Sequence, residues 1–514
     1  MRKLFKIIAL LLPLSLASCN DFFELERPPQ NPWTSLEEFE RVPIGLYASV
    51  FSGDNWNIPF VNYYMFKTSM GDDIAWVSDA SWGYWRETDQ HNQWSERNFY
   101  LLYRTISSAN LALEFVEEAG GMPFEGLTPK EVTNGFNRIL GEIYFMRGMA
   151  YYFLQTFYGP TYKPSGNGEE SIPLRLNYPK NLEEARTPTI GTTQEIFDLI
   201  LSDFERAHDL LPDQFVQGSH HPSYEVRANK FVASAMLMRL HFLRGENDQA
   251  LKFANELIDN NGGLFDLTED PIEAFNKSGV NRGREVIFYV PFFDTTLGTP
   301  HHLSVLNHTY TNERDICAWA ETRMSESMMR QLDWMQDPMT ETDFSIKAKA
   351  DKRFQQLMAV RYPEGKAPEG GVVDGRKEIS DRMSLWPYKY FRSPDNLNTN
   401  VPMIRLAEVY LTRSIIRFME NDKQGATDDL NMVKQRAWDE TVGGPFVPVT
   451  ASEITAEMIH LERVIEMFNE ADRIEYLRAL KMDIPAGDRE NTAPLSFDDG
   501  KLVWAIPAEE WIYY

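Results

Sequence analysis

Apolar residues recur at helical spacing over most of the chain. Residues 136–158 are apolar on almost every side, a pattern typical of a helix buried at the centre of a protein. Gly141 and Gly148 are small enough to let another element approach this helix closely. Gly159 and Pro160 then end it, because neither residue favours a continuing helix.

Further segments show a polar and an apolar face with the same period. They are residues 193–211, 226–243, 245–258, 402–419, 425–438 and 453–481. Thr192 and Glu195 have the spacing of a capping box at the start of the first of them. The order of helix, short break and helix is typical of helical repeats, and residues 245–257 are similar to the second helix of a tetratricopeptide repeat. The sequence therefore predicts a mostly α fold on a degenerate tetratricopeptide-like helical-repeat scaffold.

Helical periodicity weakens between residues 264 and 400. Residues 285–293 read as a strand, and loops rich in Pro, Gly and Asn dominate the remainder. We expect a loop-rich, ligand-facing subdomain with short strands here. The predicted organisation is an N-terminal helical region, 33–263, followed by a C-terminal region, 264–514, whose insert is 264–400.

The first residues indicate secretion. Residues 1–18 combine basic residues with an apolar stretch too short to span a bilayer, and they end in Leu16-Ala17-Ser18 before Cys19. Small residues before a cysteine favour a lipoprotein signal peptide over an ordinary signal with a chance cysteine. We predict cleavage before Cys19, lipidation of Cys19, and an acidic, Pro-containing tether over residues 19–32.

Charge and cysteine content narrow the possible partners. Residues 1–18 contain three basic and no acidic residues, so their removal changes the net charge from −25 to −28. A chain this acidic is not expected to bind nucleic acid or an anionic membrane surface. Cys317 is the other cysteine, so a lipidated Cys19 leaves no intramolecular disulfide, and the fold must rest on core packing.

Residues 71–94 are rich in aromatic side chains but lack helical periodicity. Trp76, Trp82, Tyr84 and Trp85 alternate there with Asp, Ser, Gly and Asn. Sugar rings stack their C–H faces on flat aromatics while their hydroxyls pair with short polar groups, so this segment suits a glycan or a peptide. The alternative is that these tryptophans fix the loop to the scaffold, as we expect for Trp94. Trp319 is a second candidate for the ligand surface.

Local motifs of catalysis, cofactor binding or phosphate binding are not found. The adjacent histidines at 220–221 and 301–302 are interpreted as solvated loop residues rather than metal ligands. Charged residues within apolar helices, such as Arg405 with Glu408, are interpreted as structural ion pairs at helical spacing rather than acid–base groups. We expect no catalytic residue, no metal and no cofactor. Residues 498–500 are predicted to form a turn.

Several motifs, taken in order, resemble one known family. They are Cys19-Asn20-Asp21-Phe22-Phe23-Glu24, the 99–110 segment with Ala109-Asn110, the stretch from Arg147 to Pro160, Arg186-Thr187-Pro188 with Asp203-Phe204, Arg227-Ala228-Asn229-Lys230, Ile404-Arg405-Leu406-Ala407-Glu408, Glu462-Arg463 with Glu466, Glu470 and Arg473, and Trp504-Ala505-Ile506-Pro507 with Glu509. Over nearly the full length the chain resembles the SusD/RagB family of surface lipoproteins. It departs from the family pattern at Ala471, where a glycine is usual, and at Tyr476, where an aspartate is usual. Both positions are expected to lie in helix packing.

The resemblance implies a binding protein rather than an enzyme. It implies an outer-membrane lipoprotein, facing the cell exterior, that captures a nutrient and hands it to a SusC-like TonB-dependent transporter. We favour an oligosaccharide as the ligand, with a peptide or glycopeptide as the alternative in the same role. A lipid-anchored glycan hydrolase is the alternative from another class, and it would need two carboxylates converging on a cleft.

Overall fold

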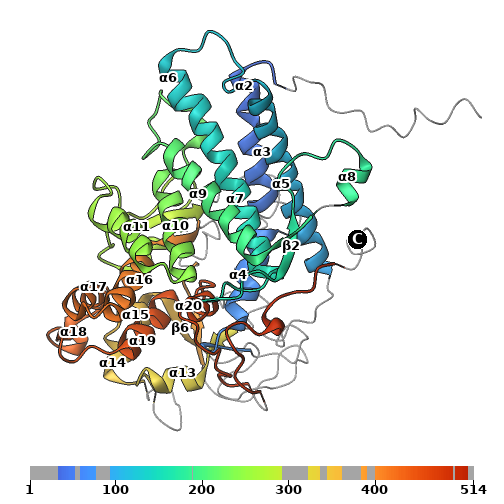
Figure 1. Cartoon of the computed structure of the whole chain (residues 1–514). Helices are drawn as coiled ribbons and strands as arrows, with labels where there is room; N and C mark the ends of the chain where they lie inside the picture. Colours follow the sequence, from blue (N-terminus) through green and yellow to red (C-terminus); the bar gives the residue numbers. More distant parts are fainter. Residues whose placement is uncertain are drawn as a thin grey trace, which may run out of the picture.

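The computed structural model is mostly helical, as the sequence predicts (Figure 1). It describes residues 33–52, 58–76, 93–187, 189–291, 322–335, 344–361, 384–390, 400–489 and 492–507. Within those ranges no helix combines the length and the apolar character needed to cross a bilayer.

The N-terminal half is built around one long buried helix, α7 (Arg138–Tyr158), which ends at Gly159 as predicted. It packs against α9 (Thr193–Leu210), α5 (Gln93–Glu118) and α3 (Arg41–Phe51). A Cβ placed on Gly148 would come within 2.9 Å of the Phe204 ring, so glycine allows α7 and α9 to approach closely. The other elements of this half are α2 (Leu36–Phe39), α4 (Pro59–Met70), α6 (Pro129–Glu131), the π-helical turn Val132–Asn137, α8 (Leu182–Arg186) and the 3₁₀ turn Pro222–Tyr224.

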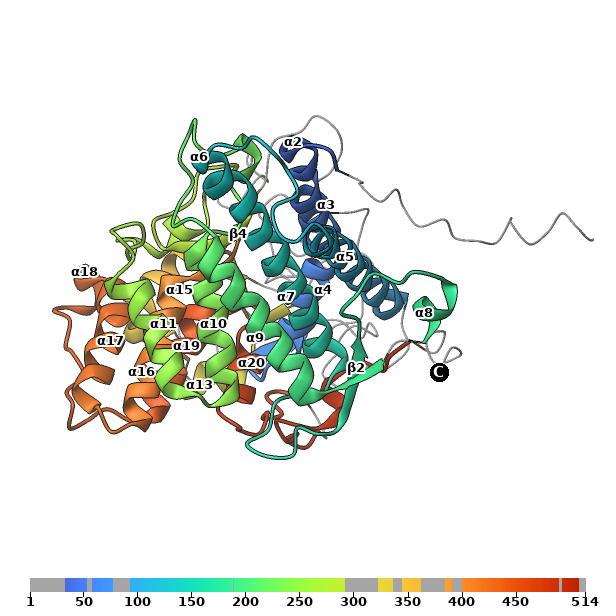
Figure 2. The same cartoon turned by 45° about the horizontal axis from the view of Figure 1, so that its top comes forward.

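A row of helices leads from the first half into the second. α9 packs on α10 (Lys230–Arg244), α10 on α11 (Asn247–Asp259), α11 on α16 (Leu406–Met419), and α16 on α17 (Lys423–Arg436), as Figures 1 and 2 show. The capping box at Thr192 forms at the start of α9. Gly245 ends α10 with a φ of +75°, a conformation that glycine adopts without strain. This stack agrees with the predicted helical-repeat scaffold.

The remaining helical elements of the second half are short. They are the 3₁₀ turn Pro271–Ala274, α13 (Glu326–Gln331), α14 (Ile346–Lys349), α15 (Lys352–Leu357), α18 (Glu440–Gly443), α19 (Ala456–Met467), α20 (Arg473–Ala479) and the 3₁₀ turn Gly500–Leu502. Asp499 caps the last turn by accepting a hydrogen bond from the Lys501 backbone N–H, consistent with the predicted turn over residues 498–500.

Strands form two-stranded antiparallel pairs in the described part of the chain. The pairs are β1 (Ile74–Trp76) with β5 (Thr322–Met324), β2 (Glu170–Leu174) with β3 (Thr189–Thr192), β4 (Val286–Val290) with β8 (Val401–Arg405), and β6 (Met358–Arg361) with β7 (Ser384–Pro387). The strand expected at 285–293 is therefore β4, shorter than predicted. Three of these pairs lie in or border the 264–400 segment, which matches the expectation of short strands there.

Two predicted helices differ from the structure. The 402–419 helix begins only at Leu406, because residues 401–405 pair with β4 as the buried strand β8. The helical stretch at 453–481 is broken into α19 and α20, because the chain turns at Asn469 and Ala471 with positive φ values of 62° and 60°. The apolar pattern of both segments also fits a continuous helix. The tertiary environment therefore decides between helix and strand in the first segment, and between helix and turn in the second.

Buried charges join the elements of the second half. Arg405 donates hydrogen bonds to Glu285, Glu466 and Glu470, and all four side chains are at most 3% exposed. The prediction that Arg405 and Glu408 pair with each other at helical spacing was wrong. Arg405 lies in β8, before the helix starts, and binds carboxylates of other segments, whereas Glu408 in α16 binds Arg239 of α10.

Candidate functional site

The structure pairs the two strands that border the segments with the candidate ligand residues. Trp76 is the last residue of β1, and Thr322 is the first residue of β5. These two residues are partners in the antiparallel register, although they are 246 positions apart in sequence. Residues 77–92 therefore begin where β1 ends, and residues 292–321 end where β5 begins.

Most of the candidate residues themselves lie outside the described residues. This holds for Trp82, Tyr84, Trp85 and Trp319, and also for Cys19. Trp76 is described as part of a strand, so the predicted loop 71–94 is shorter than expected at that end. It is also shorter at the other end, since Gln93 and Trp94 belong to α5.

The β1–β5 pair is fixed to the core by a dense set of contacts. The Ser325 backbone N–H donates to the Asp73 carbonyl at 2.8 Å, and the Ser325 hydroxyl donates to the Asp72 carbonyl at 2.7 Å. Arg473 of α20 binds the Asp72 carboxylate through two nitrogens, at 2.7 and 3.1 Å. Arg489 donates to the carbonyls of the preceding residues 69 and 71. The base of the candidate surface is therefore held to α20 and to the end of α4 by hydrogen bonds and an ion pair.

Asp73 is the unusual group in this base. Its side chain is 4% exposed, and Oδ1 has no hydrogen-bond partner within the described ranges. Burial, together with the neighbouring carboxylate of Asp72, raises the pKa of Asp73 to about 7. Near neutral pH this carboxyl is thus divided between its protonated and ionised forms.

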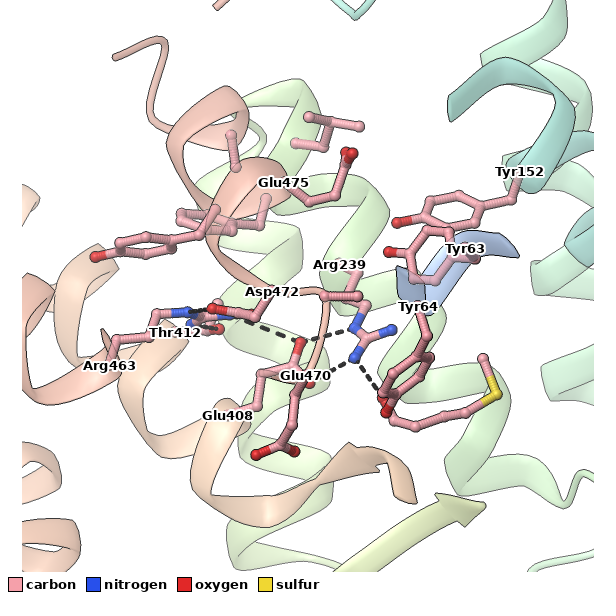
Figure 3. A pocket seen from close by; sticks show the side chains of 16 residues that line it. Tyr63, Tyr64, Tyr152, Arg239, Glu408, Thr412, Arg463, Glu470, Asp472 and Glu475 are labelled. Carbon is pink, nitrogen blue, oxygen red and sulfur yellow. Dashed lines mark hydrogen bonds and ion pairs between the residues drawn. The ribbon is translucent and has the colours of Figure 1, made fainter. Parts of the chain in front are cut away.

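A narrow polar hollow lies where α4, α7, α10, α16 and α20 meet, and Figure 3 shows it from close by. Arg239 binds Glu408 through two hydrogen bonds of 2.7 and 2.6 Å and donates a third to the Met403 carbonyl. Arg463 binds Asp472 in the same two-pronged way, at 2.7 and 2.6 Å. Tyr63, Tyr64 and Tyr152 form the opposite wall, and burial raises the pKa of each.

The charged side chains that line this hollow are ion-paired. Each acidic side chain that lines it has a cationic partner: Glu408 has Arg239, Glu470 has Arg405 and Lys389, Asp472 has Arg463, and Glu475 has Lys67. The space between the walls suits a few water molecules rather than a sugar ring.

The histidine interpretation needs a correction. His220 is not solvated: it is 8% exposed, its Nδ1 accepts a hydrogen bond from the Val216 backbone N–H, and its ring packs between Phe215 and Tyr224. Burial lowers its pKa. His221 caps the turn Pro222–Tyr224, and residues 301–302 lie outside the described residues. Within the described part of the chain, no three His, Cys, Asp or Glu side chains gather as they would around a metal ion.

Two family models match the chain in succession. The first, described as "Starch-binding associating with outer membrane", matches residues 39–242, and the second, described as "SusD family", matches residues 259–478. The chain belongs to the SusD/RagB family. No curated protein matches it. This SusD-like chain thus belongs to a family associated with the outer membrane.

Solved structures share the fold over nearly the whole chain. A SusD superfamily protein from Bacteroides fragilis has a TM-score of 0.70 and 19% identity, covering 94% of this chain and 98% of its own. A SusD-like carbohydrate binding protein from Bacteroides vulgatus has a TM-score of 0.70 and 16% identity, with coverages of 94% and 97%. Surface glycan-binding protein A from Bacteroides fluxus has a TM-score of 0.66 and 17% identity, with the same coverages. At these identities the likeness shows a common fold.

The structure also explains one departure from the family pattern. We had expected Ala471 to lie in a packed helix. It lies instead in the turn between α19 and α20, with a φ of +60°. Glycine is the residue that adopts this conformation without strain, which accounts for its usual presence there. The Ala471 backbone N–H donates to the Thr68 hydroxyl at 3.1 Å and helps to hold the turn against α4. Tyr476, the other departure, is buried in α20 as expected.

Sequence reasoning missed the residues that support the candidate surface. Asp72 and Asp73 were read as polar members of a loop, and Ser325 and Arg489 carried no signal. The two aspartates directly before the apolar Ile74 could have indicated these contacts. Carboxylates next to a buried strand normally have partners, because an unpaired buried charge is unfavourable. Their partners lie in α20 and beyond, at positions that no local pattern connects.

Proposed function

We propose that this protein is an outer-membrane lipoprotein that binds an oligosaccharide and passes it to a SusC-like TonB-dependent transporter. The single observation that carries the proposal is the pairing of Trp76 with Thr322, which joins the bases of the two aromatic-rich segments. Family membership supports it, as does the likeness to SusD-like proteins named for carbohydrate or glycan binding.

Covalent geometry restricts where the aromatic residues can lie. A chain of three residues spans at most about 11 Å and one of nine residues at most about 32 Å. Trp319 precedes Thr322 by three positions, and Trp85 follows Trp76 by nine. These spans allow aromatics from both segments to meet one ligand. Two or more stacking faces suit an oligosaccharide, whose successive rings offer repeated C–H faces.

Glycan and peptide arrays probed with residues 20–514 test the class of ligand. We expect binding to one or more neutral oligosaccharides and no release of reducing ends from the glycans that bind. Preferential binding of peptides would contradict an oligosaccharide ligand and favour a peptide or glycopeptide ligand. Reducing-end release by the pure protein would contradict a binding function and favour the hydrolase.

Co-extraction tests the transporter. Membranes from cells that express both this lipoprotein and its neighbour-encoded barrel protein are solubilised in mild detergent, and the lipoprotein is purified. We expect a large β-barrel protein to co-purify in stoichiometric amount. Recovery of the lipoprotein only as a free monomer would contradict the transporter partnership and leave ligand binding standing.

A further inference from the structure

A second cavity lies in the C-terminal half. Its volume is about 300 Å³, at the lower end of the ~300–1,000 Å³ typical of small-molecule sites. It is lined by α14, α15, α17, α18 and α19, and the labels of α14, α18 and α19 lie together at the lower left of Figure 1. We propose that this cavity, between Trp438 and the ion-paired Lys434 and Glu462, is a second binding site that takes a single neutral sugar ring.

One wall of the cavity is aromatic and held in position. Trp438 donates its Nε1–H to the Gly444 carbonyl at 2.9 Å. A Cβ on Gly443 would come within 2.1 Å of the Trp438 ring, so the glycine lets the ring lie directly against α18. Phe446 continues the wall, and its backbone N–H donates to Glu440 at 3.2 Å. A partly exposed aromatic face that is fixed in advance is what a sugar ring stacks on.

The rest of the lining is polar, and its charged side chains are ion-paired. Arg353 binds Asp351 at 2.9 and 2.7 Å and Glu462 at 2.7 Å, and Lys434 binds Glu462 at 3.1 Å. Burial would raise the pKa of Glu462, but the charges of Arg353 and Lys434 hold it below its ordinary value, so the carboxylate is ionised at neutral pH. Lys347 is a third cation in the lining, and it pairs with Asp333 outside the cavity at 3.5 Å, so each of these charges already has a partner.

This balance decides the class of ligand. A charged ligand would meet no uncompensated partner and would have to break an existing ion pair, which is costly in a buried site. A neutral ligand can use the remaining capacity of the same groups. The Lys434 side chain is 30% exposed and has three N–H donors, and carboxylate oxygens can accept further hydrogen bonds from hydroxyls.

Trp334 supplies an independent observation. It lines the cavity and is fully buried, and its indole Nε1–H has no hydrogen-bond partner within the described ranges. Buried tryptophan N–H groups normally have an acceptor, because leaving one unpaired is unfavourable. The nitrogen itself is covered, so a sugar hydroxyl would supply an acceptor only after a small shift of this wall. Aromatic faces, donors, acceptors and charges that are already paired together suit a sugar ring.

This inference rests on the proposed function only in that saccharides are the molecules the protein meets. The test uses saturation-transfer NMR on residues 20–514 with glucose, galactose, mannose and xylose, and with glucuronate as the charged comparison. The background is a Trp82→Ala/Trp85→Ala double variant, so that binding at the proposed oligosaccharide surface does not contribute. We expect at least one neutral sugar to bind this background and glucuronate to bind at least tenfold more weakly.

Variants of the cavity complete the test. Trp438→Ala should weaken binding of that sugar at least tenfold, and Phe446→Ala, at a half-buried position outside the helices, should weaken it severalfold without disturbing the fold. Met432→Ala, on the exposed face of α17, is the matched control and should change nothing. Failure of all four sugars to bind, or binding that Trp438→Ala and Phe446→Ala both leave unchanged, would overturn the second site. Loss of oligosaccharide binding in the Trp82→Ala/Trp85→Ala background bears on the proposed function alone.

Discussion

The side chains of Arg405 and Glu466 meet at 2.7 Å although 61 residues separate them in the sequence. Glu466 also binds Arg353 at 2.9 Å and Arg436 at 2.8 Å, so one carboxylate connects β8, α15 and α17 to α19. These surrounding cations hold the pKa of Glu466 well below its ordinary value, despite a burial that by itself would raise it. The C-terminal half is therefore assembled around ionised groups with few alternative partners.

Removal of Arg405 should strongly destabilise the fold. Arg405→Met would leave Glu285, Glu466 and Glu470 with reduced compensation in a buried site, and breaking such a network costs about 3–5 kcal/mol. Arg284→Met is the matched control, because Arg284 pairs with Asp266 at 3.8 Å with both side chains more than 60% exposed, and we expect a change below about 0.5 kcal/mol. Urea unfolding measures both. Equal stability of the two variants would contradict a structural role for the network.

Two helical glycines should respond to alanine in opposite directions. Gly148→Ala should cost about 1–3 kcal/mol, because its Cβ would meet the Phe204 ring where α7 packs on α9. Gly45→Ala should stabilise by about 0.5–1 kcal/mol, because Gly45 lies within α3 with no atom within 4 Å of the added Cβ. Thermal melting of the two variants gives the sign of each effect. The same sign for both would contradict the close packing of α7 and α9.

Asp73 should make stability depend on pH in a particular direction. Its folded pKa of about 7 lies above the ordinary value of 3.8, so the folded protein binds this proton more tightly than the unfolded chain. Its contribution is fully present below about pH 4 and is lost as the pH rises through 7. Asp73→Asn removes the titration and should stabilise the protein at pH 8 relative to wild type, by at most about 4 kcal/mol.

The measurement is the difference in melting temperature between Asp73→Asn and wild type at pH 5 and at pH 8. We expect this difference to become more positive at the higher pH. Asp213→Asn, at a site where the carboxylate is 67% exposed, serves as the control and should show no such change. A difference for Asp73→Asn that is the same at both pH values would show that this carboxyl does not titrate in this range.

Single alanine variants of Trp82, Trp85 and Trp319 should weaken ligand binding without unfolding the protein. Loss of one stacking face suggests a cost of roughly 1–3 kcal/mol in binding, or about five- to 150-fold in affinity. A tryptophan that instead belongs to the core would cost about 3–5 kcal/mol of stability. Calorimetric titration with the glycan identified on the array, together with thermal melting, separates the two. Early unfolding of all three variants would show that these residues are scaffold.

Cys19→Ala should release the protein from the membrane. The lipid predicted on Cys19 attaches the protein to the membrane. Without it, we expect the protein to fractionate with soluble material. Labelled palmitate should be incorporated by the wild type and not by the variant. A variant that remains with the outer membrane after a salt wash, alongside a wild type without label, would contradict lipidation of Cys19.

The sequence by itself determined most of the helices and where several of them begin and end. The apolar residues of α7, the capping box at Thr192 and the glycine that ends α10 act over a few neighbouring positions, where spacing and backbone preference decide the outcome. The order of family motifs likewise identified the family, because that order is a property of the sequence. The aromatic composition of residues 76–85 was sufficient to nominate a ligand surface.

Only the tertiary structure decided which distant residues meet. Residues 401–405 form a strand because β4 is available to pair with them, and Arg405 finds carboxylates in three other segments rather than Glu408. The pairing of Trp76 with Thr322 and the cavity beside Trp438 depend on contacts between segments far apart in sequence. Such contacts form when the whole core packs, so their free energy is shared among many elements and leaves no local pattern to read.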